Sequence, residues 1–177
     1  MMRKVICSLL VFAAVTVLAG PGLDPVFTEY GNLQSALASD NFDNARKAAG
    51  AMKDAIAHVD TKTLSAEEKK AWQSTEKNLS TATAAVQGAS EIGAARTSFE
   101  DVSKALIALA EVASPDGFAR FRCPMAFNNK GADWLQKGDT VNNPYFGASM
   151  LRCGFKVRPE HLKKKDHGHD HDHDHKH

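Results

Sequence analysis

The chain lacks most of the features that indicate a specialised class of protein. Aromatic residues make up only 7% of its 177 residues, which disfavours an aromatic-rich β-sandwich. Six prolines and twelve glycines are too few for a collagen-like or proline-rich repeat. The formal net charge is only +1, which is not basic enough to indicate a nucleic-acid partner. With 43% hydrophobic residues, the composition fits one ordinary globular domain with appendages.

The common catalytic motifs are also missing. The sequence contains no Cys-x-x-Cys, no Gly-x-Ser-x-Gly, no His-Glu-x-x-His and no phosphate-binding loop. Apart from the alternating histidines near the C-terminus, the only imidazoles are those of His58 and His161. These are too few for most general-base schemes, so we expect that the protein is not an enzyme.

Residues 1–19 have the organisation of a secretory signal peptide. Arg3 and Lys4 precede an apolar run that ends in small or medium residues at Val17 and Ala19. The run is shorter than the roughly 20 apolar residues that a transmembrane helix needs, so no membrane span is expected after cleavage. We therefore predict a cleaved signal and a periplasmic or secreted protein; an uncleaved anchor is the alternative.

Apolar residues recur every three or four positions along residues 20–113. This spacing puts them on one face of each of four helices, and short loops favour antiparallel neighbours. We therefore predict an all-α fold, an antiparallel up-down four-helix bundle. The residues expected to face inward are Val26, Tyr30, Leu33, Leu37, Phe42, Ala45, Ala49, Met52, Ile56, Val59, Trp72, Thr75, Leu79, Ala82, Val86, Ile92, Ala95, Phe99, Val102, Leu106, Leu109 and Ala113.

Side chains that typically cap helices indicate where the four helices begin. Asp24 precedes a proline and is the expected N-cap of the first helix, and Asp40 is the expected N-cap of the second. Ser65 and Glu68 have the spacing of a capping box, which opens the third helix. Ser90 is expected to begin the fourth.

Residues 114–160 differ in composition from the helical part. Pro115 prevents continuation of the last helix, and helical periodicity fades while aromatic, Asn and Gly residues become frequent. We predict an irregular Cys/aromatic-rich C-terminal cap that belongs to the same domain. Two short segments within it, Cys123–Met125 and Met150–Cys153, each place a cysteine within three residues of a methionine.

The cap contains four motifs: Cys123-Pro124-Met125-Ala126, Gly131-Ala132-Asp133-Trp134-Leu135, Asn143-Pro144-Tyr145-Phe146-Gly147 and Met150-Leu151-x-Cys153-Gly154. Together they resemble an uncharacterised domain family of bacterial exported proteins. The likeness extends over about 27–154, and it implies a setting of metal stress without a proven activity. Members of that family occur alone or fused to periplasmic adaptor subunits of copper/silver-type cation efflux systems, so such an adaptor is an implied partner.

The sulfur-bearing residues of the cap support two interpretations. Thiolate and thioether ligands favour monovalent copper or silver, so Cys123, Met125, Met150 and Cys153 are candidate ligands of a soft-metal site if their segments meet. Pro124 is expected to keep the chain extended, which points Met125 away from Cys123 unless the backbone turns. The alternative is a Cys123–Cys153 disulfide, which closes a loop of about 30 residues and stabilises by about 3–4 kcal/mol in an oxidising compartment.

The C-terminal segment 161–177 is a second candidate metal site. It alternates histidine with aspartate and has almost no apolar residues, so we expect a disordered tail. Neutral imidazole suits zinc, nickel and divalent copper, and several sites of moderate affinity are expected. A solubilising tail, or an added purification tag, is the alternative. The candidate ligands are His167, His169, His171, His173, His175 and His177.

Together these patterns favour an exported metal-binding accessory protein in copper or heavy-metal handling. The tail would capture metal ions and the sulfur-bearing cap would hold copper or silver. The alternative from a different class is a disulfide-stapled interaction module that docks onto an envelope efflux adaptor, with no metal role for the folded core.

Overall fold

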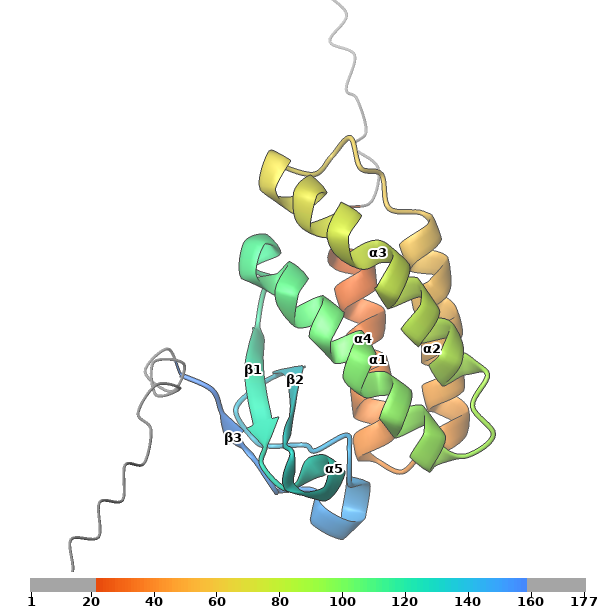
Figure 1. Ribbon diagram of the computed structural model, residues 1–177, viewed down its shortest axis with the longest axis vertical. Helices are drawn as coiled ribbons and strands as arrows, with labels where there is room; N and C mark the ends of the chain where they lie inside the picture. The colour runs from red at the N-terminus through yellow and green to blue at the C-terminus, as the bar shows by residue number, and fades with distance from the viewer. Residues whose placement is uncertain (1–21, 159–177) are drawn as a thin grey trace, which may run out of the picture.

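A computed structural model of the protein describes residues 22–158 (Figure 1). The predicted signal at 1–19 and the predicted tail at 161–177 lie outside the described residues. Four helices form the first part, and a small sheet follows them. The helices are α1 (Asp24–Ala38), α2 (Phe42–Ala57), α3 (Ala66–Gln87) and α4 (Ile92–Ala113).

The faces of the four helices agree with the apolar pattern of the sequence. All of the residues expected to face inward are buried except Phe42, Val59, Thr75, Ile92 and Ala113, which are partly buried. Consecutive helices pack against one another, α1 on α2, α2 on α3 and α3 on α4. None of the helices between residues 22 and 158 is long and apolar enough to cross a membrane.

The capping box at the start of α3 is confirmed. The Glu68 amide donates to Ser65 Oγ at 3.2 Å, and the Ser65 amide donates to Glu68 Oε2 at 2.8 Å. Both partners lie within three residues of each other, so the local sequence determines the arrangement.

Three other predicted caps are wrong. Asp24 is the first residue of α1 and makes no side-chain cap, and α4 begins at Ile92 after Glu91, so Ser90 does not cap it. The N-cap of α2 is Asn41, whose Oδ1 accepts from the Asn44 amide at 3.0 Å. Asp40 has a left-handed backbone with φ of 55°, and its carboxylate binds Arg96 and the Ala148 amide instead.

The chain after α4 contains a three-stranded antiparallel sheet, so the fold is not purely all-α and the cap is not wholly irregular. The strands are β1 (Phe118–Cys123), β2 (Ala132–Lys137) and β3 (Phe155–Lys156), in the order β2-β1-β3. In β1 the buried residues Phe121 and Cys123 alternate with the arginines Arg120 and Arg122. This period of two is the strand signal, and over six residues it is easily missed beside four long helices.

The sheet covers α1 and α4 on the side away from α2 and α3 (Figure 1). Aromatic rings fill the space between the two layers. Tyr30 of α1 stacks on Phe99 of α4 at 5.3 Å between ring centroids, and Phe99 contacts Tyr145 at 5.8 Å. Phe121 of β1 stacks on Trp134 of β2 at 5.7 Å. The helices and the sheet therefore share one core.

Two short elements connect the strands. The single turn α5 (Ala126–Asn129) follows β1, and its residues Phe127, Asn128 and Asn129 all have left-handed backbones with φ between 53° and 64°. The 3₁₀ helix η1 (Gly147–Met150) precedes β3. α5 begins three residues after Cys123, and η1 ends three residues before Cys153.

Candidate functional site

The end of β1 brings the two cysteines of the cap together. Cys123 is the last residue of β1 and is fully buried, whereas Cys153 lies between η1 and β3 and is partly exposed. Their Sγ atoms are 3.3 Å apart, and both are free thiols in this structure. The two cysteine segments thus meet in space, which their separation along the sequence does not establish by itself.

Hydrogen bonds hold the backbone of Cys153 at its amide and at its carbonyl. The Cys153 amide donates to the Met150 carbonyl at 3.0 Å, and Asn143 Nδ2 donates to the Cys153 carbonyl at 2.7 Å. Gly154 has φ of +136°, and a Cβ there would stand 2.8 Å from the Arg122 carbonyl oxygen. Only glycine tolerates this close approach, so the sulfur of Cys153 is positioned by local backbone geometry.

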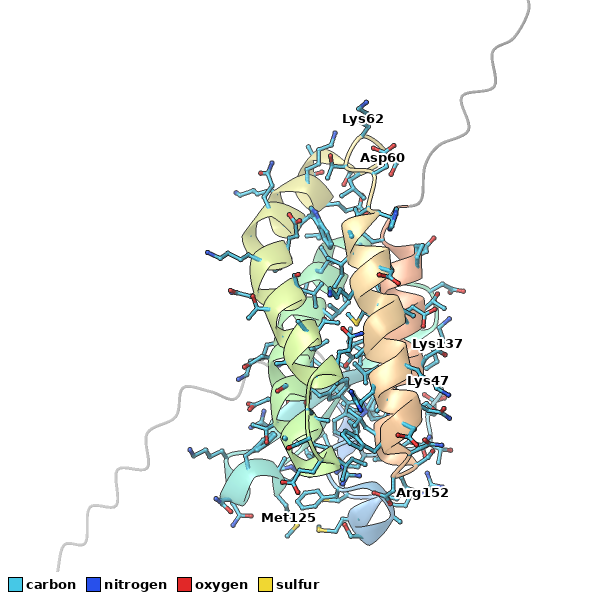
Figure 2. All side chains as sticks on the ribbon, turned by 90° about the vertical axis from the view of Figure 1, so that its right-hand side faces the viewer. Lys47, Asp60, Lys62, Met125, Lys137 and Arg152 are labelled. Atoms are coloured by element: carbon cyan, nitrogen blue, oxygen red, sulfur yellow. The ribbon has the colours of Figure 1, made fainter. Side chains whose placement is uncertain are left out.

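The two methionines lie next to the thiol pair along the chain. The backbone turns after Pro124, so the Met125 amide forms a hydrogen bond with the Cys153 thiol. The Met125 side chain is 47% exposed and projects from the end of the molecule in Figure 2. Met150 is partly buried at the end of η1. Both backbones are therefore in contact with Cys153, while the thioethers lie at or near the surface.

The surroundings of Cys153 favour the protonated form of its thiol. Burial raises the pKa of Cys153, and the hydrogen bond with Cys123 raises it further, while the Met125 amide lowers it. A metal ion that binds this sulfur has to displace a proton, so its affinity falls as the pH decreases.

Within the part of the chain that the structure describes, the pair has no ready-made cage of further metal ligands. Among residues 22–158 no group of three His, Cys, Asp or Glu side chains is close enough to hold one metal ion. The carboxylate of Asp133 in β2 is already engaged: Arg120 Nε donates to one of its oxygens at 2.9 Å, and Arg122 donates to the other at 2.8 Å. Among residues 22–158, thioethers are therefore the ligands that this end of the sheet offers besides the two thiols.

Arg96 of α4 attaches the cap to the helices. Its Nε donates to the Pro144 carbonyl and one terminal nitrogen donates to the Leu37 carbonyl, both at 2.9 Å. The same nitrogen pairs with Asp40 Oδ1 at 2.5 Å. The guanidinium thus joins α1, α4 and the loop before η1, and it lowers the pKa of Asp40.

The start of η1 is fitted to this ion pair. Asp40 Oδ2 accepts from the Ala148 amide at 2.8 Å, which lowers the pKa of Asp40 further. Gly147 has φ of +57°, and a Cβ at this position would overlap the carboxylate of Asp40 and the guanidinium of Arg96. The glycine of the Asn-Pro-Tyr-Phe-Gly motif therefore has a packing role, and sequence reasoning missed it because the partners are distant in the chain.

Two buried tyrosines attach β2 to the helices. The Tyr30 hydroxyl accepts from the Leu135 amide at 3.0 Å and hydrogen-bonds Ser103 Oγ at 2.9 Å. The Tyr145 hydroxyl donates to the Asp133 carbonyl at 2.5 Å. Burial raises the pKa of both phenols well above the ordinary value, so both stay neutral and act as hydrogen-bonding groups.

The predicted ligands of the tail lie outside the described residues, so the cysteine end of the sheet is the candidate site of the folded part.

The family described as "Protein of unknown function (DUF3347)" matches residues 26–117, just over half of the chain. The chain belongs to this family. No curated protein and no solved structure matches it significantly.

The DUF3347 match covers the four helices and ends just before β1. The motifs that place the cysteines and methionines all follow Gly117, so they lie beyond the matched segment. Within the DUF3347 segment, Tyr30, Asp40 and Arg96 provide the contacts that carry the cap. The family match therefore covers the four helices, whereas the cysteines and methionines of the cap lie outside it.

Proposed function

We propose that this DUF3347 protein is an exported metal-binding accessory protein, periplasmic or secreted, that takes part in copper or heavy-metal handling. The observation that carries the proposal is the approach of two free thiols to 3.3 Å at one end of the sheet. A fold that holds two thiols this close has either a disulfide or a shared soft ligand as its natural use.

The ligand set favours monovalent copper or silver. Thiolate and thioether are soft ligands, and a thioether binds without losing a proton. Met125 and Met150 are the thioethers whose backbones contact Cys153. Their unbranched side chains have the length to turn toward the thiol pair, which we propose happens when the metal binds.

The scaffold in this proposal is an antiparallel up-and-down bundle that forms one domain with the cap. Consecutive helices pack on each other and the connections between them are short, as such a topology requires. The shared aromatic core between helices and sheet supports the single-domain assignment.

The tail has a separate role in the proposal. Its six alternating imidazoles would gather zinc, nickel or divalent copper ions at several sites of moderate affinity. Because hard and soft ligands lie in different segments, the two sites would bind different ions. Truncation after Lys165 tests this role: zinc capture in equilibrium dialysis should fall strongly, while copper(I) binding stays unchanged. Zinc capture that persists undiminished would contradict the role of the tail.

The proposed partner is a periplasmic adaptor of a cation efflux system. This follows from the resemblance of the cap motifs to exported domains that occur fused to such adaptors, together with the signal-like segment at 1–19. Delivery to an adaptor requires an exposed metal site, and Met125 is exposed at the end of the molecule (Figure 2).

A docking module without a metal role is the second candidate. It is favoured by large apolar side chains on the cap surface: Met125 is 47% exposed and Phe155 is 42% exposed. In the sheet Phe155 pairs with Arg122 of β1, one residue before Cys123. Phe155 and Met125 therefore belong to the same end of the sheet. A partner protein could cover this surface.

Competition with a copper(I) chelator decides between the two candidates. The reduced wild-type chain should take copper(I) from the chelator, and a chain with both Cys123→Ser and Cys153→Ser should lose this ability. The pair Met125→Ala and Met150→Ala should weaken binding by a smaller factor, because the thiolates remain. Unchanged binding in the cysteine variant would contradict the proposed site and favour the docking module.

A further inference from the structure

We propose that the Cys123–Cys153 pair is a thiol–disulfide switch on the soft-metal site, in which Cys153 reacts first and Cys123 completes the bond. The metal-gating part of this inference rests on the proposed function, whereas the order of reaction rests only on geometry and burial. The reduced pair would bind a monovalent soft metal, and the oxidised pair would not.

The distance between the sulfurs suits both states. A disulfide needs an S–S separation of about 2.05 Å. In a tetrahedral zinc site, whose metal–sulfur bonds are about 2.3 Å long and serve here as the reference, two sulfurs lie roughly 3.8 Å apart. The observed 3.3 Å falls between these values, so either state needs a displacement of little more than 1 Å. Side-chain rotation supplies this shift while the surrounding backbone stays hydrogen-bonded.

The two sulfurs differ in their access to solvent. Cys123 has no exposed surface, because it ends β1 in register with Ala132 of β2 and belongs to the core. Cys153 lies outside the strands and is partly exposed. A disulfide from solvent can therefore reach Cys153, while Cys123 reaches only its neighbour.

The reaction balances with an external disulfide as the oxidant. The Cys153 thiol first gives up its proton, and the resulting thiolate attacks one sulfur of that disulfide. A mixed disulfide forms, and the expelled thiolate takes up the proton and leaves as the first thiol. Cys123 then attacks the Cys153 sulfur, which forms the Cys123–Cys153 bond and releases the second thiol. The protein loses two electrons and two protons, and the external disulfide gains them as two thiols.

Oxidation closes the site because it consumes both thiolates at once. The methionine thioethers that remain are weaker ligands than thiolates, and among residues 22–158 no other group of His, Cys, Asp or Glu is arranged to replace them. The redox state of this thiol pair would therefore limit how much soft metal the cap binds.

Glutathione disulfide tests the order of reaction. The full chain carries Cys7→Ser, so that only the two cap thiols respond, and mass spectrometry follows the products. A chain with Cys123→Ala should accumulate a stable mixed disulfide at Cys153. A chain with Cys153→Ala should stay unmodified or react at least ~10-fold more slowly. Equal reaction of both variants would overturn the order.

Brief alkylation of the unmutated pair gives a second readout that does not depend on how the variants fold. Peptide mapping should find Cys153 labelled before Cys123. First labelling of Cys123 would overturn the assignment. A wild-type pair that stays fully reduced in glutathione disulfide would overturn the switch itself.

Silver(I) titration separates the switch from the proposed metal function. The reduced chain with a truncation after Lys165 should bind silver(I), and its oxidised form should lose at least ~10-fold in affinity. Equal binding by both forms would overturn the gating. Absence of binding by the reduced form would overturn the metal site, although the thiol–disulfide chemistry would still be measurable.

Discussion

A single phenol determines how β2 joins the helices. β2 is an edge strand, so its outward amide at Leu135 has no partner in the sheet, and the Tyr30 hydroxyl accepts from it. A buried amide without a partner costs more than a hydrogen bond contributes when it is made. Tyr30 therefore contributes more to stability than the packing of its ring alone would.

Removal of this hydroxyl should destabilise the protein measurably. We expect Tyr30→Phe to lower the free energy of unfolding by about 1–3 kcal/mol, because it leaves the Leu135 amide buried and unpaired. Tyr145→Phe is the matched control: it removes a donor to the Asp133 carbonyl, and an under-satisfied carbonyl is tolerated better than an orphaned amide. Urea denaturation measures the free energy of unfolding of both variants. A larger loss in Tyr145→Phe than in Tyr30→Phe would contradict this role of the Tyr30 hydroxyl.

The Asp40–Arg96 ion pair should make the stability depend on acid pH. The pair lowers the pKa of Asp40 in the folded state, so its contribution is fully present above the unfolded value of about 3.9 and is lost as the pH falls through the lower folded value. Because Asp40 is 42% exposed, the contribution stays below about 1 kcal/mol.

Asp40→Asn isolates this charge, since asparagine also adopts the left-handed backbone that Asp40 has. Thermal unfolding should show the wild type to be more stable than the variant at pH 7, with the difference shrinking toward pH 2. A difference that is the same at both pH values would show that the charge is not involved.

At the scale of elements, the sequence predicts what depends on neighbours along the chain. The helix faces follow from apolar spacing, and the Ser65–Glu68 box follows from a three-residue motif. The role of Asp40 could not be predicted in this way, because its partners Arg96 and Ala148 lie 56 and 108 residues away.

The sequence signals for the sheet and for the contact between the two cysteines are weaker than those for the helices. The alternation in β1 covers only six residues, and β3 contains two, so their pairing depends on long-range contacts. The cysteine–methionine segments were recognisable as sulfur-rich, but the turn after Pro124 that brings Met125 to Cys153 has no local signature.

The attachment of η1 to the helices should tolerate no side chain at Gly147. Gly147→Ala combines a left-handed alanine with overlap on the Asp40–Arg96 pair, and we expect a loss of about 2–4 kcal/mol. Gly138→Ala is the matched control, because Gly138 has φ of +79° and a Cβ there would meet nothing within 4 Å, so only the backbone cost of about 1–2 kcal/mol remains. Equal losses in chemical denaturation would contradict the packing role of Gly147.

At the scale of the whole molecule, the four helices are a platform and the chemistry lies at the cap. Tyr30 and Arg96 extend from the helices to hold β2 and the loop before η1. This attachment fixes the segments on which Cys123 and Cys153 meet. We therefore expect that destabilising the attachment weakens soft-metal binding even though no ligand is altered.

X-ray absorption at the copper edge tests the proposed soft-metal site most directly. The reduced full chain is loaded with one equivalent of copper(I), so that thiolates, thioethers and the tail imidazoles compete for the same ion. We predict a first coordination shell made of sulfur, which is lost when Cys123 and Cys153 are both replaced by serine. A first shell of nitrogen and oxygen in the unmutated chain would contradict the proposed site.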